Sequence, residues 1–375
     1  NTFMSKIPYF VPNITKKDIL NVTNVLKSKW ISPGKILTEL EASFAKTLGV
    51  SKAKCIGVSS GYAALFLAIR LLNLKKNDIV LMPNINFVAS SNIVKFFKGK
   101  IVLVDAENKD NPNISIKDLE KKLSSKVKAV IICHYGGYPC DMQNIMRLKK
   151  KYNFALIEDA CHAMFSKYKN KKYLGSFGDF AAFSFYANKN ITSAEGGMLY
   201  CKKQIDANKS RILKNHGLNT DSFTHSVNRY HKNYDVTEVG YNFRLDDVRS
   251  SLLINQINKI QVNNSKRHKI FLNYLKLLKL NNKIEVLFSD YKSNNYSRHL
   301  FVILAKNKKK IQNRLKLNGI SFSCHYKPIN QLKIHKNKKK YKHSSYLFDH
   351  MISLPIYPGL SYFQIQKICK IINNN

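Results

Sequence analysis

The amino-acid sequence predicts an α/β fold with an open, mostly parallel sheet and a second, smaller α+β region. Short apolar runs alternate with helical patterns between residues 54 and 186, which is typical of a parallel sheet with helices on both faces. After residue 246 the pattern changes to two long helices and shorter strands. A chain of 375 residues can divide into two lobes, so we expect a large domain over residues 1–245 and a small C-terminal domain over residues 246–375.

The N-terminal part is predicted to be helical before the alternation begins. Apolar residues at helical spacing predict a helix over residues 16–27. Thr38 followed by Glu41 fits a capping box, in which two side chains satisfy backbone N–H groups at the start of a helix. A second helix is therefore expected over residues 38–48.

The alternating region contains six expected strands and four expected helices. The strands are expected over residues 54–59, 78–82, 101–105, 129–134, 154–159 and 179–186. The helices between them are expected over residues 62–72, 87–97, 116–123 and 141–152. In the C-terminal region we expect helices over residues 247–260, 266–278 and 308–318, the last ended by Gly319, and a strand over residues 298–304.

The composition is that of a globular protein, with 44% hydrophobic and 11% aromatic residues. No apolar run reaches the length needed to cross a bilayer, and residues 1–11 lack the apolar core of a signal peptide. We therefore expect no membrane contact and a cytoplasmic location. The seven cysteines are scattered without metal-ligand spacing, so we expect reduced thiols and no metal site.

The formal net charge of +40 is compatible with nucleic-acid binding, with anionic substrates or with a Lys- and Asn-rich composition. The lysines are spread along the whole chain, and asparagine is abundant too. No zinc-finger or RRM-type signature occurs. We favour compositional bias with some benefit for anionic ligands, and we expect no nucleic-acid partner.

The stretch from Ser176 to Gly197 organises the rest of the chain. An apolar run, typical of a strand buried on both faces, leads into Lys189. A lysine at the end of a buried strand loses water, which lowers its pKa and suits Schiff-base chemistry. The alternative is a lysine whose ammonium reaches solvent from the strand end.

Other unusual residues follow strands whose carboxyl ends share one edge of the sheet. They are Gly61 with its neighbouring serines at a helix N-terminus, Asp159, His162, Ser184 and Phe87. Each has a structural alternative, such as a tight turn, a helix cap or a core ring. Together with Lys189 they match the needs of pyridoxal phosphate (PLP), which are an imine-forming lysine, a carboxylate, a phosphate site and an aromatic face.

The chain resembles the DegT/DnrJ/EryC1/StrS family of PLP-dependent nucleotide-sugar aminotransferases over nearly its whole length. The matching motifs are VSSGYAAL (58–65), PNINFVAS (83–90), IEDACHA (157–163), GSFGDFAAFSFYANKNITSAEGG (175–197), EVGYNFRLDDVRSSL (238–252), HYKPI (325–329) and SLPIYP (353–358). The resemblance implies a type I PLP-dependent aminotransferase fold and a homodimer with shared active sites.

The resemblance also implies a role for each matching residue. Lys189 resembles the lysine that binds the cofactor covalently and then transfers protons, and Asp159 resembles the partner of its ring nitrogen. The remaining cofactor contacts implied are Gly61, Tyr62 and Ala63 through their backbone, Ser184 at the phosphate, Phe87 stacked on the ring, His162 near the ring, and Asn242 reaching the neighbouring subunit's phosphate.

The chain departs from the family pattern at a few positions. Tyr62 replaces the usual threonine, and Ser193-Ala194 replaces Thr-Gly. Asn188 before the lysine resembles the perosamine-synthase branch. The implied reaction moves the amine of L-glutamate to a nucleotide-linked keto-sugar, with C4 of a 4-keto-6-deoxyhexose as the expected carbon. The alternatives are a C3-specific enzyme, a non-catalytic PLP-binding regulator and a nucleic-acid binder.

Overall fold

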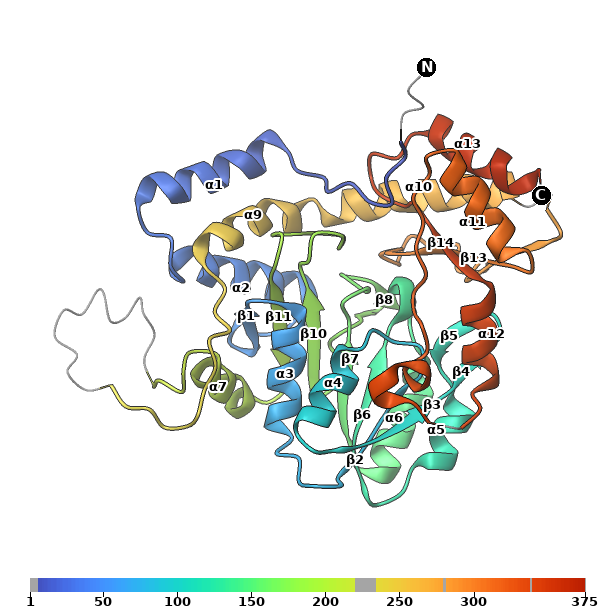
Figure 1. The fold of residues 1–375 in the computed structure, drawn as a ribbon. Helices are drawn as coiled ribbons and strands as arrows, with labels where there is room; N and C mark the ends of the chain where they lie inside the picture. The colour runs from blue at the N-terminus through green and yellow to red at the C-terminus, as the bar shows by residue number, and fades with distance from the viewer. Residues whose placement is uncertain (1–5, 220–233, 279–280, 338, 375) are drawn as a thin grey trace.

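A seven-stranded sheet in the order β1-β11-β10-β7-β6-β2-β3 forms the centre of the molecule (Figure 1). The computed structural model describes residues 6–219, 234–278, 281–337 and 339–374. The strands of the sheet are β1 Cys55–Val58, β2 Ile79–Pro83, β3 Lys100–Val104, β6 Val127–Cys133, β7 Ala155–Asp159, β10 Phe180–Ser184 and β11 Gly197–Cys201. Strand β11 is antiparallel to β1 and β10, and the pairs from β10 to β3 are parallel. The predicted α/β class is confirmed.

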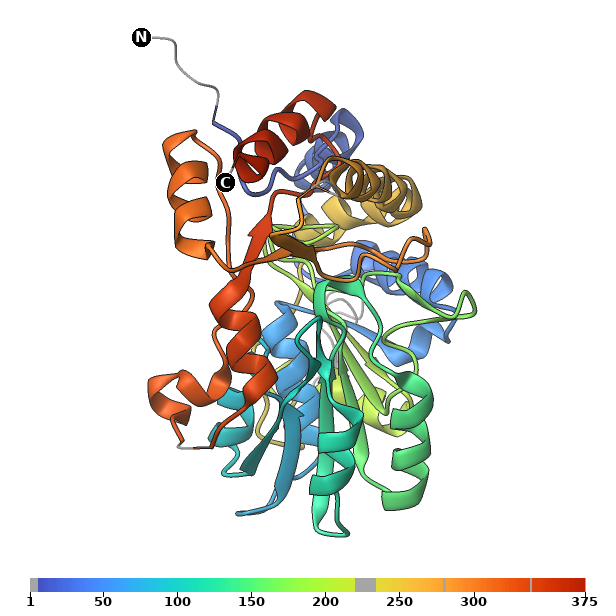
Figure 2. The same ribbon diagram turned by 90° about the vertical axis from the view of Figure 1, so that its right-hand side faces the viewer.

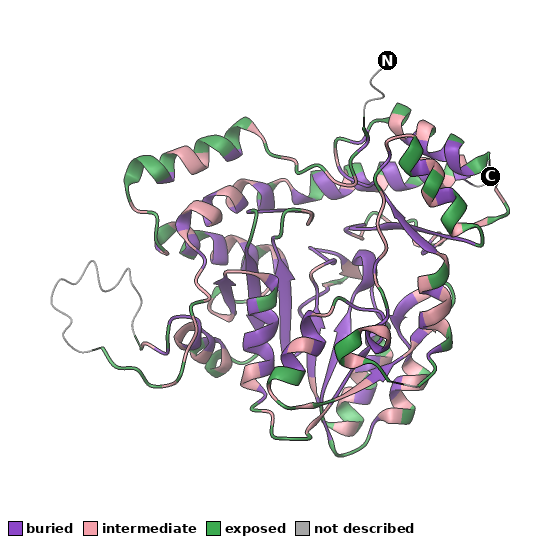
Figure 3. Cartoon of the chain, in the orientation of Figure 1, coloured by how far each residue is buried: buried purple, intermediate pink, exposed green. Residues whose placement is uncertain are grey.

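Helices cover both faces of this sheet. One face carries α2 Lys35–Leu48, α5 Ile116–Lys122, α6 Met142–Tyr152 and α9 Asp247–Asn258, and the other carries α3 Gly61–Leu71, α4 Ala89–Phe96 and α7 Gln204–Leu213. In β6, Val130 and Ile132 pack in the first layer, whereas Ala129 and Ile131 pack in the second. Successive strand residues point to opposite faces, so apolar residues at every position bury both (Figure 3).

Helix α2 begins before the predicted residue, and the predicted capping box of Thr38 and Glu41 is wrong. Gly34 is the N-cap, and the Asp247 carboxylate of α9 accepts the N–H groups of Gly34 and Leu37 at 2.9 Å each. Thr38 lies inside the helix and donates its hydroxyl to the Gly34 carbonyl at 3.1 Å. A carboxylate from a distant helix thus satisfies the first-turn N–H groups, which no local pattern reveals.

A second region lies above the main sheet (Figure 2). Its antiparallel sheet has the order β12-β13-β14, with β12 Ile284–Val286, β13 Phe301–Ala305 and β14 Met351–Leu354. The accompanying helices are α10 Ile260–Leu278, α11 Lys308–Leu317, α12 Lys342–His350 and α13 Tyr362–Asn373. Gly319 follows α11 with a φ of 69°, which agrees with its predicted role as a helix end.

The remaining elements complete the chain. They are α1 Lys16–Ser28, the hairpins β4 Ala106–Asn108 with β5 Asn111–Ile114 and β8 Lys167–Tyr168 with β9 Lys172–Tyr173, and the 3₁₀ turns Lys52–Lys54, Tyr135–Gly137, Ile329–Gln331 and Lys333–His335. Within the described ranges, no helix combines the length and the apolar character needed to cross a membrane.

Two segments pack in the region that lies across the predicted domain boundary at residue 245. Ile7 donates its N–H to the Gly319 carbonyl at 2.9 Å and packs in the C-terminal apolar cluster. Ile329 belongs to the same buried apolar cluster as residues of α3 and α4, and it donates its N–H to the Asn84 carbonyl at 2.9 Å. The division into residues 1–245 and 246–375 stays a prediction. The return of the chain at Ile329 brings the preceding residues to the strand ends of the main sheet.

Candidate active site

The carboxyl ends of β6, β7 and β10 meet the N-terminus of α3 around a cavity of about 380 Å³. Open α/β sheets bind their ligands at this edge. The predicted site residues that line the cavity are Gly61, Tyr62, Phe87, Asp159, His162, Ser184 and Lys189. The fold therefore gathers residues from four separate parts of the sequence into one hollow.

Lys189 lies in the turn that follows β10. The strand ends at Ser184 rather than at the predicted Tyr186, and the Lys189 N–H donates to the Tyr186 carbonyl at 2.9 Å. Loss of water around its amine lowers the pKa of Lys189, and the nearby cysteines and the carboxylate of Asp159 offset only part of that decrease. A lowered pKa increases the fraction of free amine, which is the nucleophilic form.

Asp159 is the last residue of β7 and is 5% exposed. Its Oδ1 accepts the Cys161 N–H at 3.2 Å, and its carboxylate lines the same cavity as Lys189. A carboxylate taken out of water needs donors or a positive charge nearby. The cavity therefore holds a buried carboxylate and a desolvated amine, a combination that supports proton transfer.

The N-terminus of α3 supplies backbone donors to the cavity. Ser60 caps the helix by accepting the Ala63 N–H at 3.0 Å, and the first helical N–H groups, of Gly61 and Tyr62, lack partners inside the helix. A Cβ added to Gly61 would lie 2.7 Å from the Ser184 Cβ. Glycine thus allows the Ser184 hydroxyl to approach the helix end, where donors and the helix dipole favour an anion.

Phe87 and His162 line the cavity with rings. Phe87 is 56% exposed, and its ring centre is 5.8 Å from that of Tyr326. His162 is 3% exposed, and its Nε2 lies 2.8 Å from the Tyr326 hydroxyl. Burial holds the pKa of His162 well below its usual range, helped by the charge of Lys189. The cavity thus offers an aromatic face and a neutral imidazole to a flat ligand.

Two of the predicted residues lie outside the cavity. Ala63 is buried, and its N–H is used by the Ser60 cap. Asn242 is exposed, and its Oδ1 accepts the Arg244 Nε–H at 3.1 Å. Their cofactor contacts stay predictions.

Sequence reasoning assigned no role to several other residues of the cavity. Asn86, His325 and Tyr326 line it, and Asn188 lies next to Lys189. Within the described ranges, Asn86 Nδ2 and Asn188 Oδ1 are buried polar atoms without a hydrogen-bond partner. The signals available in the sequence were the HYKPI motif and the asparagine before the lysine, but neither pattern alone reveals an unpartnered atom.

The residues present fit PLP. The α3 N-terminus with the Ser184 hydroxyl suits a phosphate, Phe87 offers a ring face, and Asp159 offers a carboxylate. The two unpartnered amide atoms need a polar ligand, because buried polar groups are otherwise hydrogen-bonded. The cavity supplies an anion site, an amine and a carboxylate within one hollow, as this cofactor requires.

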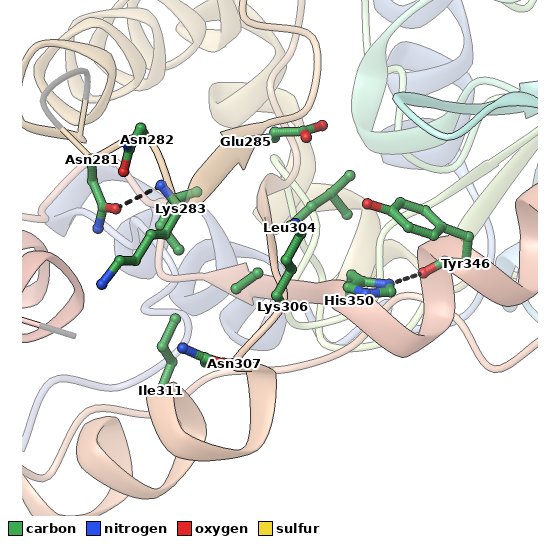
Figure 4. A pocket seen from close by; sticks show the side chains of 12 residues that line it. Asn281, Asn282, Lys283, Glu285, Leu304, Lys306, Asn307, Ile311, Tyr346 and His350 are labelled. Atoms are coloured by element: carbon green, nitrogen blue, oxygen red, sulfur yellow. Dashed lines mark hydrogen bonds between the residues drawn. The ribbon is translucent and has the colours of Figure 1, made fainter.

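A second cavity, of about 420 Å³, lies in the C-terminal region (Figure 4). Its lining includes Lys283, Lys306 and Tyr346, and the Tyr346 carbonyl accepts from His350 Nδ1 at 2.7 Å. It is slightly larger than the cavity at Lys189, but the strand ends of the main sheet do not contribute to it. We therefore place the candidate active site in the cavity that contains Lys189.

The fold and the site define an aminotransferase. Residues 12–373 match the model of the DegT/DnrJ/EryC1/StrS aminotransferase family. The chain belongs to this family, as the sequence motifs predicted.

Relatives of known name match nearly the whole chain. It is 34% identical to the UDP-4-amino-4,6-dideoxy-N-acetyl-beta-L-altrosamine transaminase of Campylobacter jejuni, over 88% of this chain and 86% of the relative. It is 30% identical to the GDP-perosamine synthase of Escherichia coli O157:H7, over 99% and 98%. The PLP-form of Spr1654 from Streptococcus pneumoniae superposes with a TM-score of 0.88 at 26% identity, covering 98% of each chain.

Proposed function

We propose that this chain is a PLP-dependent aminotransferase that moves an amino group from L-glutamate to the keto carbon of a nucleotide-linked sugar. The observation that carries the proposal is the shared cavity of Lys189, with its lowered pKa, and the buried Asp159. The family and the PLP-form of a solved relative support the cofactor. The named relatives support a sugar nucleotide as the acceptor.

Several residues would hold the cofactor without taking part in bond making. The N–H groups of Gly61 and Tyr62, with the Ser184 hydroxyl, would bind its phosphate at the positive end of α3. Phe87 would cover one face of its ring. Asp159 would keep a proton on its ring nitrogen, because the negative carboxylate favours the positive form. So held, PLP supplies the electron sink that makes a neighbouring C–H acidic.

Lys189 has the central chemical role in this proposal. As a free amine it would remove the proton from the reacting carbon, and as an ammonium it would return one, acting as general base and then general acid. Its lowered pKa gives Lys189 a larger share of free amine than an exposed lysine has at the same pH. Over the two half-reactions L-glutamate becomes 2-oxoglutarate, and the keto-sugar nucleotide becomes an amino-sugar nucleotide.

We propose C4 of a 4-keto-6-deoxyhexose as the position aminated. The name of the Campylobacter relative states a 4-amino-4,6-dideoxy sugar linked to UDP, so the amine of that product is on C4. The match to that relative covers 88% of this chain. A C3-specific enzyme is the alternative with the same fold and cofactor.

We also propose a homodimer in which each active site uses both chains. Asn242 is exposed outside the cavity, in a segment whose backbone is anchored by pairing with Asn215. Arg244 lies beside it and donates to its Oδ1. Asn242 is therefore an exposed amide outside its own chain's cavity, which suits a contact across an interface.

Incubation with [¹⁵N]glutamate tests the reaction. The acceptors are UDP- and GDP-linked 4-keto-6-deoxyhexoses, with a 3-keto sugar nucleotide as the matched alternative, and NMR locates the label. We expect ¹⁵N on C4 of one 4-keto acceptor. Label transfer to the 3-keto acceptor alone would establish the C3 alternative. PLP binding without any amino product would favour a regulatory protein.

A further inference from the structure

The His162 ring connects a backbone donor on one side to the Tyr326 hydroxyl on the other. The Gly136 N–H donates to His162 Nδ1 at 3.3 Å. On the opposite edge, His162 Nε2 lies 2.8 Å from the Tyr326 hydroxyl oxygen. The two rings are nearly parallel, at 24°, with centres 5.8 Å apart.

This geometry fixes the proton of His162. A backbone N–H can only donate, so Nδ1 must accept and cannot carry a hydrogen. In the neutral ring the hydrogen is then on Nε2, which donates it to the Tyr326 oxygen. A second proton would have to sit on Nδ1 and would oppose the Gly136 N–H, so the hydrogen bonds and the burial of His162 favour the same neutral state.

The hydroxyl hydrogen of Tyr326 is left for a ligand. Its oxygen accepts from His162, and among the residues the structure describes the hydroxyl has no other hydrogen-bond partner. The Tyr326 side chain lines the cavity together with Phe87 and Lys189. Burial raises the pKa of Tyr326, so the phenol keeps its hydrogen and can donate it.

A second set of contacts holds His162 in place. The His299 ring lies against it, with centres 4.4 Å apart. Asn190, which follows the active-site lysine, donates its Nδ2 to Ser297 O at 2.6 Å and to Asn264 Oδ1 at 3.1 Å. Its Oδ1 must therefore accept from His299 Nδ1, at 3.2 Å. The two imidazoles are thus fixed by groups on both regions of the molecule.

We propose that Tyr326 donates a hydrogen bond to an oxygen of the ligand in this cavity, and that His162 is a positioning residue which aims that donor. The inference rests on the proposed function, because the ligands are PLP and the keto-sugar. The acceptor is a carbonyl or anionic oxygen. Both the cofactor and the sugar carry such an oxygen, so the experiment separates the two.

The central variant is Tyr326→Phe, which keeps the ring against Phe87 and removes only the hydroxyl. The matched control is Tyr168→Phe, because Tyr168 lies in strand β8 outside the cavity and its hydroxyl accepts the backbone N–H of Gln143 at 3.3 Å. PLP affinity and the visible spectrum are measured without substrate. KM and kcat are measured with glutamate and the UDP- or GDP-linked 4-keto-6-deoxyhexose that the wild type accepts.

Tyr326→Phe is expected to weaken one ligand about tenfold, as for the loss of one hydrogen bond. A weaker PLP complex with a shifted absorption band assigns the acceptor to the cofactor. An unchanged spectrum with a raised KM assigns it to the sugar. If the PLP affinity, KM and kcat of Tyr326→Phe lie within about twofold of those of Tyr168→Phe, this inference is wrong and the proposed function stands. A wild type that binds neither PLP nor the keto-sugar nucleotide would overturn the proposed function as well.

A double-mutant cycle tests the positioning role of His162. His162→Leu removes the Nε2–H donor, and His162→Gln retains a donor amide. We expect His162→Leu to reproduce the Tyr326→Phe defect, His162→Gln to restore part of the loss, and His162→Leu to add less than about twofold in the Tyr326→Phe background. If the losses caused by His162→Leu and Tyr326→Phe multiply in the double variant, His162 does not act through Tyr326.

Discussion

Two adjacent carboxylates at the end of β7 have opposite surroundings. Glu158 is 0% exposed, and each of its oxygens accepts two hydrogen bonds. The donors are His134 Nε2 at 2.9 Å and the N–H groups of Gly175 at 2.8 Å, Phe177 at 2.7 Å and Gly178 at 2.6 Å. Asp159, the next residue, lines the cavity with Lys189.

The difference follows from the alternation of a strand, which sends successive side chains to opposite faces. On the face of Glu158 the protein supplies every donor, so this carboxylate holds the loop after β9 in place. On the face of Asp159 polar atoms remain for a ligand, including Asn86 Nδ2. One side chain stabilises the fold, and its neighbour serves the chemistry.

The largest effect on activity is expected from Lys189→Ala. It removes the general base and acid, so kcat should fall about ten-thousand-fold while the fold remains. Single-turnover rates measure the loss of activity, and circular dichroism shows whether the fold is retained. The control is Lys316→Ala on the exposed side of α11. If Lys189→Ala kept more than about a tenth of wild-type activity, Lys189 would not be the catalytic lysine.

Glu158→Ala should cause the largest loss of stability. It leaves buried donors without an acceptor, each of which costs about 1–3 kcal/mol, so the free energy of unfolding should fall by at least about 3 kcal/mol. Urea denaturation of the apoprotein measures it. Glu158→Gln, which keeps an acceptor oxygen, should lose less. Equal stability of wild type and Glu158→Ala would contradict the structural role of this face.

Asp159→Asn should show the reverse pattern. Loss of the negative charge should reduce kcat about a hundredfold or more, while the free energy of unfolding changes by less than about 1 kcal/mol. Measured beside Glu158→Ala, this variant isolates the effect of the face on which the carboxylate lies, because the two residues are neighbours on one strand. A stability loss equal to that of Glu158→Ala would show that both carboxylates are structural.

The smallest effect is expected from Asn242→Ala. In the shared-site dimer it removes one phosphate contact, so PLP should bind several-fold more weakly with no change in the unfolding transition. Sedimentation gives the oligomeric state of the same sample. A monomer that still transaminates would refute the shared site.

Local patterns predicted six of the seven strands of the main sheet, because strands buried on both faces are continuous apolar runs. They missed β11, although it is buried along its whole length. The same patterns led to Lys189 and Asp159, since charged residues directly after such runs are conspicuous. The start of α2 was mispredicted because Asp247, far along the chain, caps it. Tyr326 was found in the cavity only through the tertiary return of the chain at Ile329, which no spacing encodes.

Reductive trapping of the cofactor tests whether Lys189 binds PLP covalently. Purified protein is mixed with PLP at pH 8, its visible spectrum is recorded, borohydride is added, and the labelled peptides are mapped. Exposed lysines are protonated at this pH, and the lowered pKa of Lys189 gives it a larger share of free amine than they have. We expect an imine band and a reduced label on Lys189. No band, or a label spread over surface lysines, would contradict this expectation.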